Sequence, residues 1–135
     1  MIENIILTED DADDIMFFQY ALSEIGYNYS PYIAKNSDEL FTILNNMTKP
    51  PEIIFLDINM PGTDGLESLQ LLREKPSLTN CKVVILTTTN SKDIIETCRN
   101  LGADLFATKP SSLNELVSML KKILIDNVPF DFLYK

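Results

Sequence analysis

The feature that most constrains this fold is a regular alternation between short apolar runs and segments with helical spacing. The run IIFL at residues 53–56 is apolar at every position, which is typical of a parallel strand covered by helices on both faces. Three similar runs and one weaker run recur along the chain. The expected strands cover residues 5–7, 31–34, 53–56, 83–86 and 105–107.

Between these runs, apolar residues recur three to four positions apart, as they do on one face of a helix. Ser37 is expected to be the N-cap of the second helix, and Ser112 with Glu115 forms a capping box at the start of the fifth. Gly26 and Gly102 stand where the first and fourth helices should end. The apolar faces contain Ile15, Phe18, Leu22 and Ile25; Leu40, Ile43, Leu44 and Met47; Leu66, Leu69 and Leu72; and Leu116, Met119, Leu120 and Ile123, with the fourth helix at residues 91–101.

Five strands alternating with five helices predict an α/β fold, in which a parallel sheet lies between two layers of helices. Right-handed crossovers make this a doubly wound three-layer sandwich. The 135 residues suit a single domain, which we expect at residues 1–126. In such sheets the ligand site lies at the carboxyl ends of the strands.

Residues 127–135 form a tail beyond the expected fold, and we expect no output domain. Four of its residues are aromatic or apolar: Phe130, Phe132, Leu133 and Tyr134. The favoured hypothesis is that these side chains fold back onto the domain. The alternative is that they form a dimer contact or an arm that docks a partner. We therefore expect a monomer or a weak homodimer.

The composition excludes several classes of function. The chain has no histidine, which rules out catalytic triads, phosphotransfer from its own histidines and zinc sites built on imidazole. Its net charge of −9 repels phosphate backbones, so we expect no binding to nucleic acid. No apolar run approaches the roughly 20 residues of a membrane span, and the N-terminus lacks a signal-peptide pattern. We therefore expect a cytoplasmic protein that does not bind membranes, with Cys81 and Cys98 as reduced, half-buried packing residues.

Polar residues follow the expected strands at the edge where a ligand would bind. Glu9 and Asp10 follow the first strand, Asp57 the third, Thr87 the fourth and Lys109 the fifth. Clustered carboxylates repel one another unless a cation joins them. Oxygen ligands without histidine or thiolate favour Mg²⁺, with Mn²⁺ as the second choice. The lysine and the hydroxyl suit a phosphoryl group, and Asp57 would be the nucleophile, since carboxylates form acyl phosphates.

Each of these residues also has a plainer interpretation. Taken alone, the acidic residues 9–11 are better explained as a helix N-terminus favoured by the helix dipole. Thr87 could satisfy backbone groups of its loop, and Lys109 could be a solvated surface residue. Asp57 is harder to explain in this way, because a carboxylate directly after four apolar residues is costly if unpaired. The coincidence of all these residues at one sheet edge favours the functional interpretation.

Four motifs resemble the receiver domain of bacterial response regulators, the CheY-like family, over the chain up to about residue 125. They are ILTEDD at 6–11, IIFLDINMPGTDG at 53–65, VVILTTT at 83–89 and GADLFATKP at 102–110. The third-strand motif together with the Lys-Pro pair is specific to that family. The resemblance implies a stand-alone receiver domain with the sheet order 2-1-3-4-5.

The resemblance also implies a metal-binding phosphoacceptor site. Asp57 corresponds to the phosphoacceptor of the family. Glu9 and Asp10 correspond to its acidic metal-binding pair, and the backbone carbonyl of Asn59 to a further metal ligand. The cofactor implied is Mg²⁺.

Four further positions match the switching residues of the family. Thr87 corresponds to the hydroxyl that moves toward the phosphoryl group, and Lys109 to the ion-pair partner of that group. Phe106 occupies the position of a rotating aromatic residue, which is a tyrosine in many members. The bond between Lys109 and Pro110 corresponds to a cis peptide bond, which an X-Pro pair adopts at little cost.

The function implied is that of a phosphoacceptor in a two-component phosphorelay system, and not of a turnover enzyme. A histidine kinase or a histidine phosphotransfer protein would donate the phosphoryl group, and the domain would catalyse its own phosphorylation and dephosphorylation. The new charge would reshape the face formed by the fourth helix, the fifth strand and the fifth helix. That face would bind an unknown downstream protein.

Three alternatives fit parts of this pattern. A degenerate receiver would bind partners without being phosphorylated. A phosphatase with an aspartyl nucleophile would need a second aspartate where Asn59 stands. A flavin carrier of similar topology would need a phosphate-binding loop in place of the acidic residues 9–11.

Overall fold

The computed structural model describes residues 2–126, 129 and 131–134. Within these residues, five strands alternate with five α-helices, with one added turn of 3₁₀ helix, η1. In chain order these are β1 (Ile5–Thr8), α1 (Ala12–Glu24), β2 (Tyr32–Ala34), α2 (Ser37–Asn46), β3 (Ile53–Leu56), α3 (Gly65–Arg73), η1 (Pro76–Leu78), β4 (Lys82–Thr87), α4 (Lys92–Asn100), β5 (Leu105–Thr108) and α5 (Leu113–Leu124).

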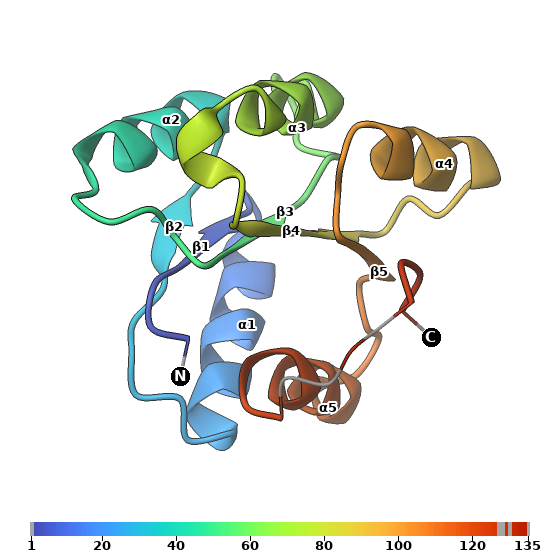
Figure 1. Cartoon of the computed structure of the whole chain (residues 1–135). Helices are drawn as coiled ribbons and strands as arrows, with labels where there is room; N and C mark the ends of the chain where they lie inside the picture. Colours follow the sequence, from blue (N-terminus) through green and yellow to red (C-terminus); the bar gives the residue numbers. More distant parts are fainter. Residues whose placement is uncertain (1, 127–128, 130, 135) are drawn as a thin grey trace.

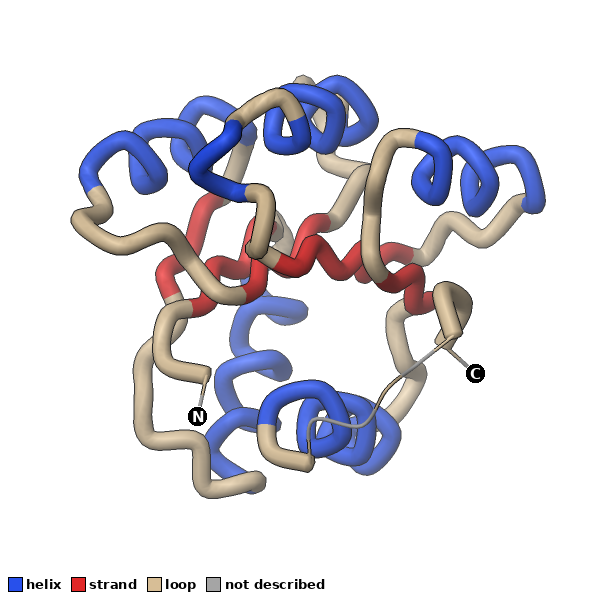
Figure 2. Tube along the Cα trace, viewed as in Figure 1, coloured by secondary structure: helices blue, strands red, loops and turns tan. Residues whose placement is uncertain are grey.

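The strands form one parallel sheet in the order β2-β1-β3-β4-β5. Helices α2, α3 and α4 cover one face of this sheet, and α1 and α5 cover the other (Figures 1 and 2). The doubly wound three-layer sandwich and its sheet order are therefore confirmed. Within the described part of the chain, no helix combines the length and the apolar character that a membrane crossing needs.

Two apolar cores lie on opposite faces of the sheet and explain why the strands are apolar between their end residues. Alternate residues of β1 point to opposite sides, so that Ile5 joins the core under α1 and α5, and Ile6 joins the core under the other helices. In the first core the Phe18 and Phe55 rings pack edge to face with their centroids 5.0 Å apart. Both faces of each central strand are thus buried, which requires continuous apolar sequence.

Cys81 and Cys98 are free thiols within the core under α2, α3 and α4. Both are buried rather than half-buried, and burial raises the pKa of the Cys81 thiol to about 12 and that of Cys98 to about 11. They are therefore inert packing residues, because a thiol reacts through its thiolate.

Side chains at the start of each α-helix accept hydrogen bonds from first-turn backbone N–H groups. The capping residue of α5 is Ser112, as expected, with its Oγ 3.2 Å from the N of Glu115. The N-cap of α2 is Asn36 and not the expected Ser37. Asn36 has an extended backbone and its Oδ1 lies 2.8 Å from the N of Glu39, whereas the Ser37 hydroxyl pairs with Ser68 on α3 at 2.8 Å.

The described part of the tail folds back onto the open edge of β5 (Figure 1). The N–H of Phe106 donates to the carbonyl of Phe132 at 2.7 Å, and the N–H of Tyr134 donates to the carbonyl of Phe106 at 2.9 Å. Leu133 forms a parallel bridge with Phe106 between these two bonds. The fold-back hypothesis is thus confirmed for these residues, while Phe130 lies outside the described part of the chain.

Arg73, at the end of α3, contacts two connecting segments of the chain, the one between α3 and β4 and the one between α4 and β5. Its Nε donates to the carbonyl of Gly102 at 2.8 Å, its Nη1 to that of Leu78 at 3.0 Å, and its Nη2 to that of Cys81 at 2.9 Å. Nη2 also pairs with Asp104 Oδ2 at 2.6 Å. The guanidinium therefore holds η1 and the loop before β5 against α3, using donor directions that an ammonium group cannot reproduce.

Arg73→Lys should lower the free energy of unfolding by about 1–3 kcal/mol, because the partly buried carbonyls of Leu78 and Cys81 lose their donors. Urea denaturation followed by circular dichroism measures this change. The matched control is Arg99→Lys, at the other arginine of the chain: its pair with Glu96 is exposed and should contribute little, and a lysine keeps a cation available to the Phe132 ring, which the guanidinium covers at 4.6 Å from the centroid. Equal losses in the two variants would contradict this role for Arg73.

Candidate functional site

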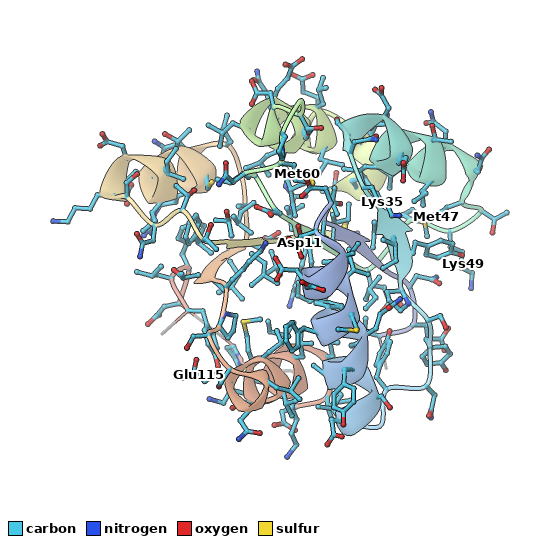
Figure 3. All side chains as sticks on the ribbon, turned by 180° about the vertical axis from the view of Figure 1, so that it is seen from behind. Asp11, Lys35, Met47, Lys49, Met60 and Glu115 are labelled. Carbon is cyan, nitrogen blue, oxygen red and sulfur yellow. The ribbon has the colours of Figure 1, made fainter. Side chains whose placement is uncertain are left out.

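The site lies at the carboxyl edge of the sheet, where neighbouring strands end side by side. Thr8 and Leu56 are register partners at the ends of β1 and β3, so the next residues, Glu9 and Asp57, emerge together. Thr87 ends β4 opposite Thr108 of β5, and Lys109 follows directly. Figure 3, which views the molecule from behind, labels Asp11 and Met60 near its middle, between α1 and α3. The parallel sheet thus gathers residues that are up to 100 positions apart in the sequence.

Glu9, Asp10 and Asp57 form an acidic trio, in which one carboxylate oxygen from each residue lies within 4.8 Å of the others. Glu9 and Asp57 are buried, at 3% and 4% exposure, while Asp10 is exposed. Three negative charges this close repel one another unless a cation joins them. Carboxylate oxygens with one solvent-facing member suit a hard divalent ion that keeps several of its waters. The trio therefore fits a divalent metal site, as predicted.

The Lys109 ammonium neutralises part of this charge. Its Nζ lies 2.6 Å from Glu9 Oε1, 2.7 Å from Asp14 Oδ2 and 3.0 Å from Asp57 Oδ2. The three carboxylate oxygens around the nitrogen are as many as the N–H donors of an ammonium. Glu9, Asp10, Asp57 and Lys109 are thus brought together as the sequence predicted.

Asp14 is the site residue that sequence reasoning missed. It lies in the first turn of α1, and the apolar spacing of that helix gives no weight to an acidic position. The sequence did contain one indication of its role. Asp14 stands three residues after Asp11, the N-cap, and the first turn of a helix that follows β1 starts at the sheet edge where β1 ends. Any side chain of that turn that points toward the sheet faces the site.

Backbone N–H groups hold the two buried carboxylates in place. Asp57 Oδ1 accepts the N–H of Asn59 at 2.9 Å, and Glu9 Oε2 accepts the N–H groups of Asp10 and Asp11 at 3.1 and 3.2 Å. These bonds leave Asp57 Oδ2 and Glu9 Oε1 directed at Lys109. The metal-binding role of the Asn59 carbonyl stays a prediction.

Burial and the lysine act against each other on the charge state of the site. Burial raises the pKa of Glu9 to about 7, against the opposing hydrogen bond from Lys109. Burial disfavours the charged form of Lys109 too, but its hydrogen bonds to Asp14, Glu9 and Asp57 outweigh this and raise the pKa of the ammonium well above its usual range. The lysine is therefore a fixed positive charge beside Asp57.

Gly65 allows the loop after Asp57 to pack closely against α3. A Cβ atom at this position would collide with the backbone and side chain of Ile58, the residue next to Asp57. Gly65 is buried and is the first residue of α3, directly after the N-cap residue Asp64. The second glycine of the MPGTDG motif thus fixes the path of the loop that follows Asp57.

Thr87 and Phe106 lie on the strands that lead to the site, but outside the cluster around Lys109. Thr87 is fully buried, and its Oγ1 accepts the N–H of Thr89 at 3.5 Å. Phe106 is fully buried in the core under α4, where its ring centroid lies 6.5 Å from that of Phe132. Their switching roles stay predictions.

The expected cis bond between Lys109 and Pro110 is wrong for this structure. Within the described residues no peptide bond is cis, so this bond is trans. Trans is the intrinsically preferred isomer of an X-Pro bond, by roughly 0.5–1 kcal/mol. With the trans bond, Lys109 already reaches its three carboxylate partners.

A cavity of about 250 Å³ opens beside the cluster, between α1 and α5. Glu9, Asp14 and Lys109 form its polar end, and Phe17 and Leu116 are among its apolar walls. Lys109 and Asp14 therefore line this cavity together with Glu9, the one member of the acidic trio that borders it.

The model of the response regulator receiver domain matches residues 5–121. This range covers most of the chain, together with every residue of the acidic trio and the lysine. The chain therefore belongs to the receiver-domain family of response regulators, as the motifs predicted.

Three similar proteins illustrate the relationship. The phosphate regulon transcriptional regulatory protein PhoB of Pseudomonas aeruginosa is 29% identical over 129 residues, which are 96% of this chain and 55% of PhoB. The crystal structure of the phosphorylated cyanobacterial phytochrome response regulator RcpA matches 96% of this chain and 98% of its own, with a TM-score of 0.83 and 25% identity. The Mn²⁺-bound form of the response regulator Rcp1 matches 96% of this chain and 99% of its own, with a TM-score of 0.82 and 25% identity. The chain thus spans about half the length of PhoB and nearly all of the two solved receivers.

Mn²⁺ or Mg²⁺ should stabilise the protein against unfolding, because the ion neutralises the acidic trio of the folded state. Free cation at a hundredfold excess over its Kd would add about 2.7 kcal/mol. Thermal unfolding with and without the cation measures this effect.

Asp10→Asn should remove most of the stabilisation, because it takes away one oxygen ligand and one charge of the trio. Asp13→Asn is the matched control: it removes the same charge from an exposed position in the first turn of α1 and should retain the full effect. Equal responses in the two variants would place the cation elsewhere.

Proposed function

We propose that this protein is the phosphoacceptor of a two-component phosphorelay system and receives its phosphoryl group on Asp57. The observation that best supports this is the position of Asp57, whose carboxylate belongs to the acidic trio and has a lysine ammonium 3.0 Å from its Oδ2. Two opposite environments on one carboxylate suit a group that must accept a phosphoryl group with its negative charges. Membership of the receiver family points to the same chemistry.

In the proposed transfer, an Asp57 carboxylate oxygen attacks the phosphorus of a partner's phosphohistidine. The new P–O bond forms as the P–N bond breaks, and the departing imidazole nitrogen keeps the bonding electrons. Glu9, Asp10, Asp57 and the Asn59 carbonyl would hold Mg²⁺, or Mn²⁺ in its place, and this cation would neutralise charge on the transferring group. Lys109 would contribute a second positive charge from the opposite side.

The Lys109 ammonium already lies beside the Asp57 carboxylate, where this role needs a positive charge. Its side chain is 16% exposed, so its charge acts in a partly desolvated environment where electrostatic interactions are stronger than in water. The N–H of Asn59 holds the other oxygen of Asp57, which fixes the orientation of the nucleophile. The positive charge beside Asp57 and the orientation of its carboxylate are thus in place before a donor arrives.

Loss of the phosphoryl group would follow from attack of water on phosphorus, with Asp57 leaving as a carboxylate. The site would therefore catalyse both its own phosphorylation and its own dephosphorylation, and it would act as a switch and not as a turnover enzyme. Asn59 stands where an aspartyl phosphatase would need a second aspartate, which argues against steady turnover of phosphomonoesters.

The output we propose is a change in the face formed by α4, β5 and α5. Thr87 would move toward the phosphoryl group, and Phe106 would respond through β5, the strand that also carries the described part of the tail. An unknown downstream protein would read this face. A histidine kinase or histidine phosphotransfer protein would be the donor, in the cytoplasm, without nucleic acid or membrane as a partner.

Acetyl phosphate with Mg²⁺ should add one phosphoryl group, detected as an increase in intact mass, because the site supplies both the metal and the lysine. Asp57→Asn should abolish the addition. Asp38→Asn, an exposed first-turn position of α2, is the control that should leave it unchanged.

Addition of the group to the Asp57→Asn variant would show that another residue is the acceptor. No addition to the unaltered protein, from acetyl phosphate or from a phosphohistidine donor, would favour a degenerate receiver that binds partners without phosphorylation.

A further inference from the structure

The contact between Asp14 and Lys109 adds a fourth carboxylate to the site. Asp14 Oδ2 lies 2.7 Å from the ammonium, which is closer than Asp57 Oδ2 at 3.0 Å. The contact joins residues 95 positions apart, the first turn of α1 and the residue that follows β5. The inference below rests on the proposed function, because it concerns how this lysine meets a phosphoryl group on Asp57.

Asp14 differs from the other two partners of Lys109. Glu9 and Asp57 belong to the acidic trio and have side chains that are 4% and 5% exposed. Asp14 lies outside that trio, and its side chain is 41% exposed at the cavity between α1 and α5. It can therefore exchange its partner for water at a smaller cost than either buried carboxylate.

A phosphoryl group on Asp57 would need donors that are already in use. Three carboxylate oxygens lie within 3.0 Å of the ammonium nitrogen, as many as it has N–H groups, so a phosphoryl oxygen can take a place beside this nitrogen only if one carboxylate gives up its contact. Glu9 is held by two backbone N–H groups and is buried. Asp14 is thus the partner whose contact with the Lys109 ammonium can be broken at the smallest cost.

We propose that Asp14 is a positioning residue, which holds the Lys109 ammonium in the resting protein and competes with the phosphoryl group for it. Its negative charge also opposes a second anion near the same ammonium, so competition and repulsion act in the same direction. The resting state is favoured by this contact, and phosphoryl binding is weakened by it.

Beryllofluoride with Mg²⁺, a non-covalent mimic of the phosphoryl group, provides the test. Asp14→Asn removes the charge, keeps the size and retains an oxygen that can accept from Lys109. It should bind beryllofluoride about threefold more tightly, which is the size of effect expected for one partly exposed ion pair. Asp14→Glu keeps the charge and should restore most of the resting affinity.

The matched control is Asp13→Asn. Asp13 is the neighbouring residue in the same first turn and is exposed, so its substitution makes the same change to the net charge and the same change near the helix dipole. Its affinity for beryllofluoride, measured by ¹⁹F NMR, should stay near that of the unaltered protein. The ¹⁵N resonance of the Lys109 ammonium should shift in Asp14→Asn and stay in place in Asp13→Asn, with no phosphoryl mimic present.

The outcomes separate this inference from the proposed function. If the unaltered protein takes up no beryllofluoride, the phosphoacceptor function is wrong and the competition falls with it. If the unaltered protein binds it, but Asp14→Asn binds no more tightly than Asp13→Asn, the function stands and the competition is wrong. An unchanged Lys109 resonance in Asp14→Asn would overturn the positioning role itself.

Discussion

The mutual repulsion of carboxylates at the end of the sheet is the constraint on which the other features of the site depend. Glu9 and Asp57 are buried, so their charges cannot be screened by water alone. Lys109 lies within 3.0 Å of both, and backbone N–H groups take the remaining oxygens. The apolar strands that gather these groups therefore create an electrostatic cost, which one ammonium offsets in part and which a divalent cation would offset further.

The fold could be predicted in more detail than the site, because burial of the strands on both faces leaves a pattern in the sequence and side-chain contacts do not. Strands such as IIFL at residues 53–56 are apolar throughout because helices cover both of their faces, and that pattern is visible without any tertiary information. The parallel order then places Glu9, Asp57 and Lys109 at one edge. The sequence did not distinguish between two neighbouring residues that could both cap α2. Asn36 is the cap because its backbone is extended there, while the Ser37 hydroxyl is hydrogen-bonded to the hydroxyl of Ser68 on α3.

Features that depend on a contact between distant side chains could not be derived from sequence patterns. In the sequence, Asp14 is one of several acidic residues at the start of α1. Only its contact with Lys109 in the folded structure distinguishes it from Asp13. Arg73 reads as an ordinary helix-ending cation, although its guanidinium binds three carbonyls of two other segments. In both cases the information lies in the geometry of the partner, which the spacing of residues along one element does not contain.

The placement of Phe132, Leu133 and Tyr134 along β5 has a consequence for how the molecule behaves in a crowded solution. Exposed edge strands are templates on which other chains can add β-structure and aggregate. On one side of this sheet the tail occupies the free N–H and carbonyl of Phe106. On the other side the edge strand β2 has three residues and directly follows Pro31, which has no N–H to offer. One edge strand of the sheet is thus short and the other is covered. This protects the sheet against the addition of strands from other molecules.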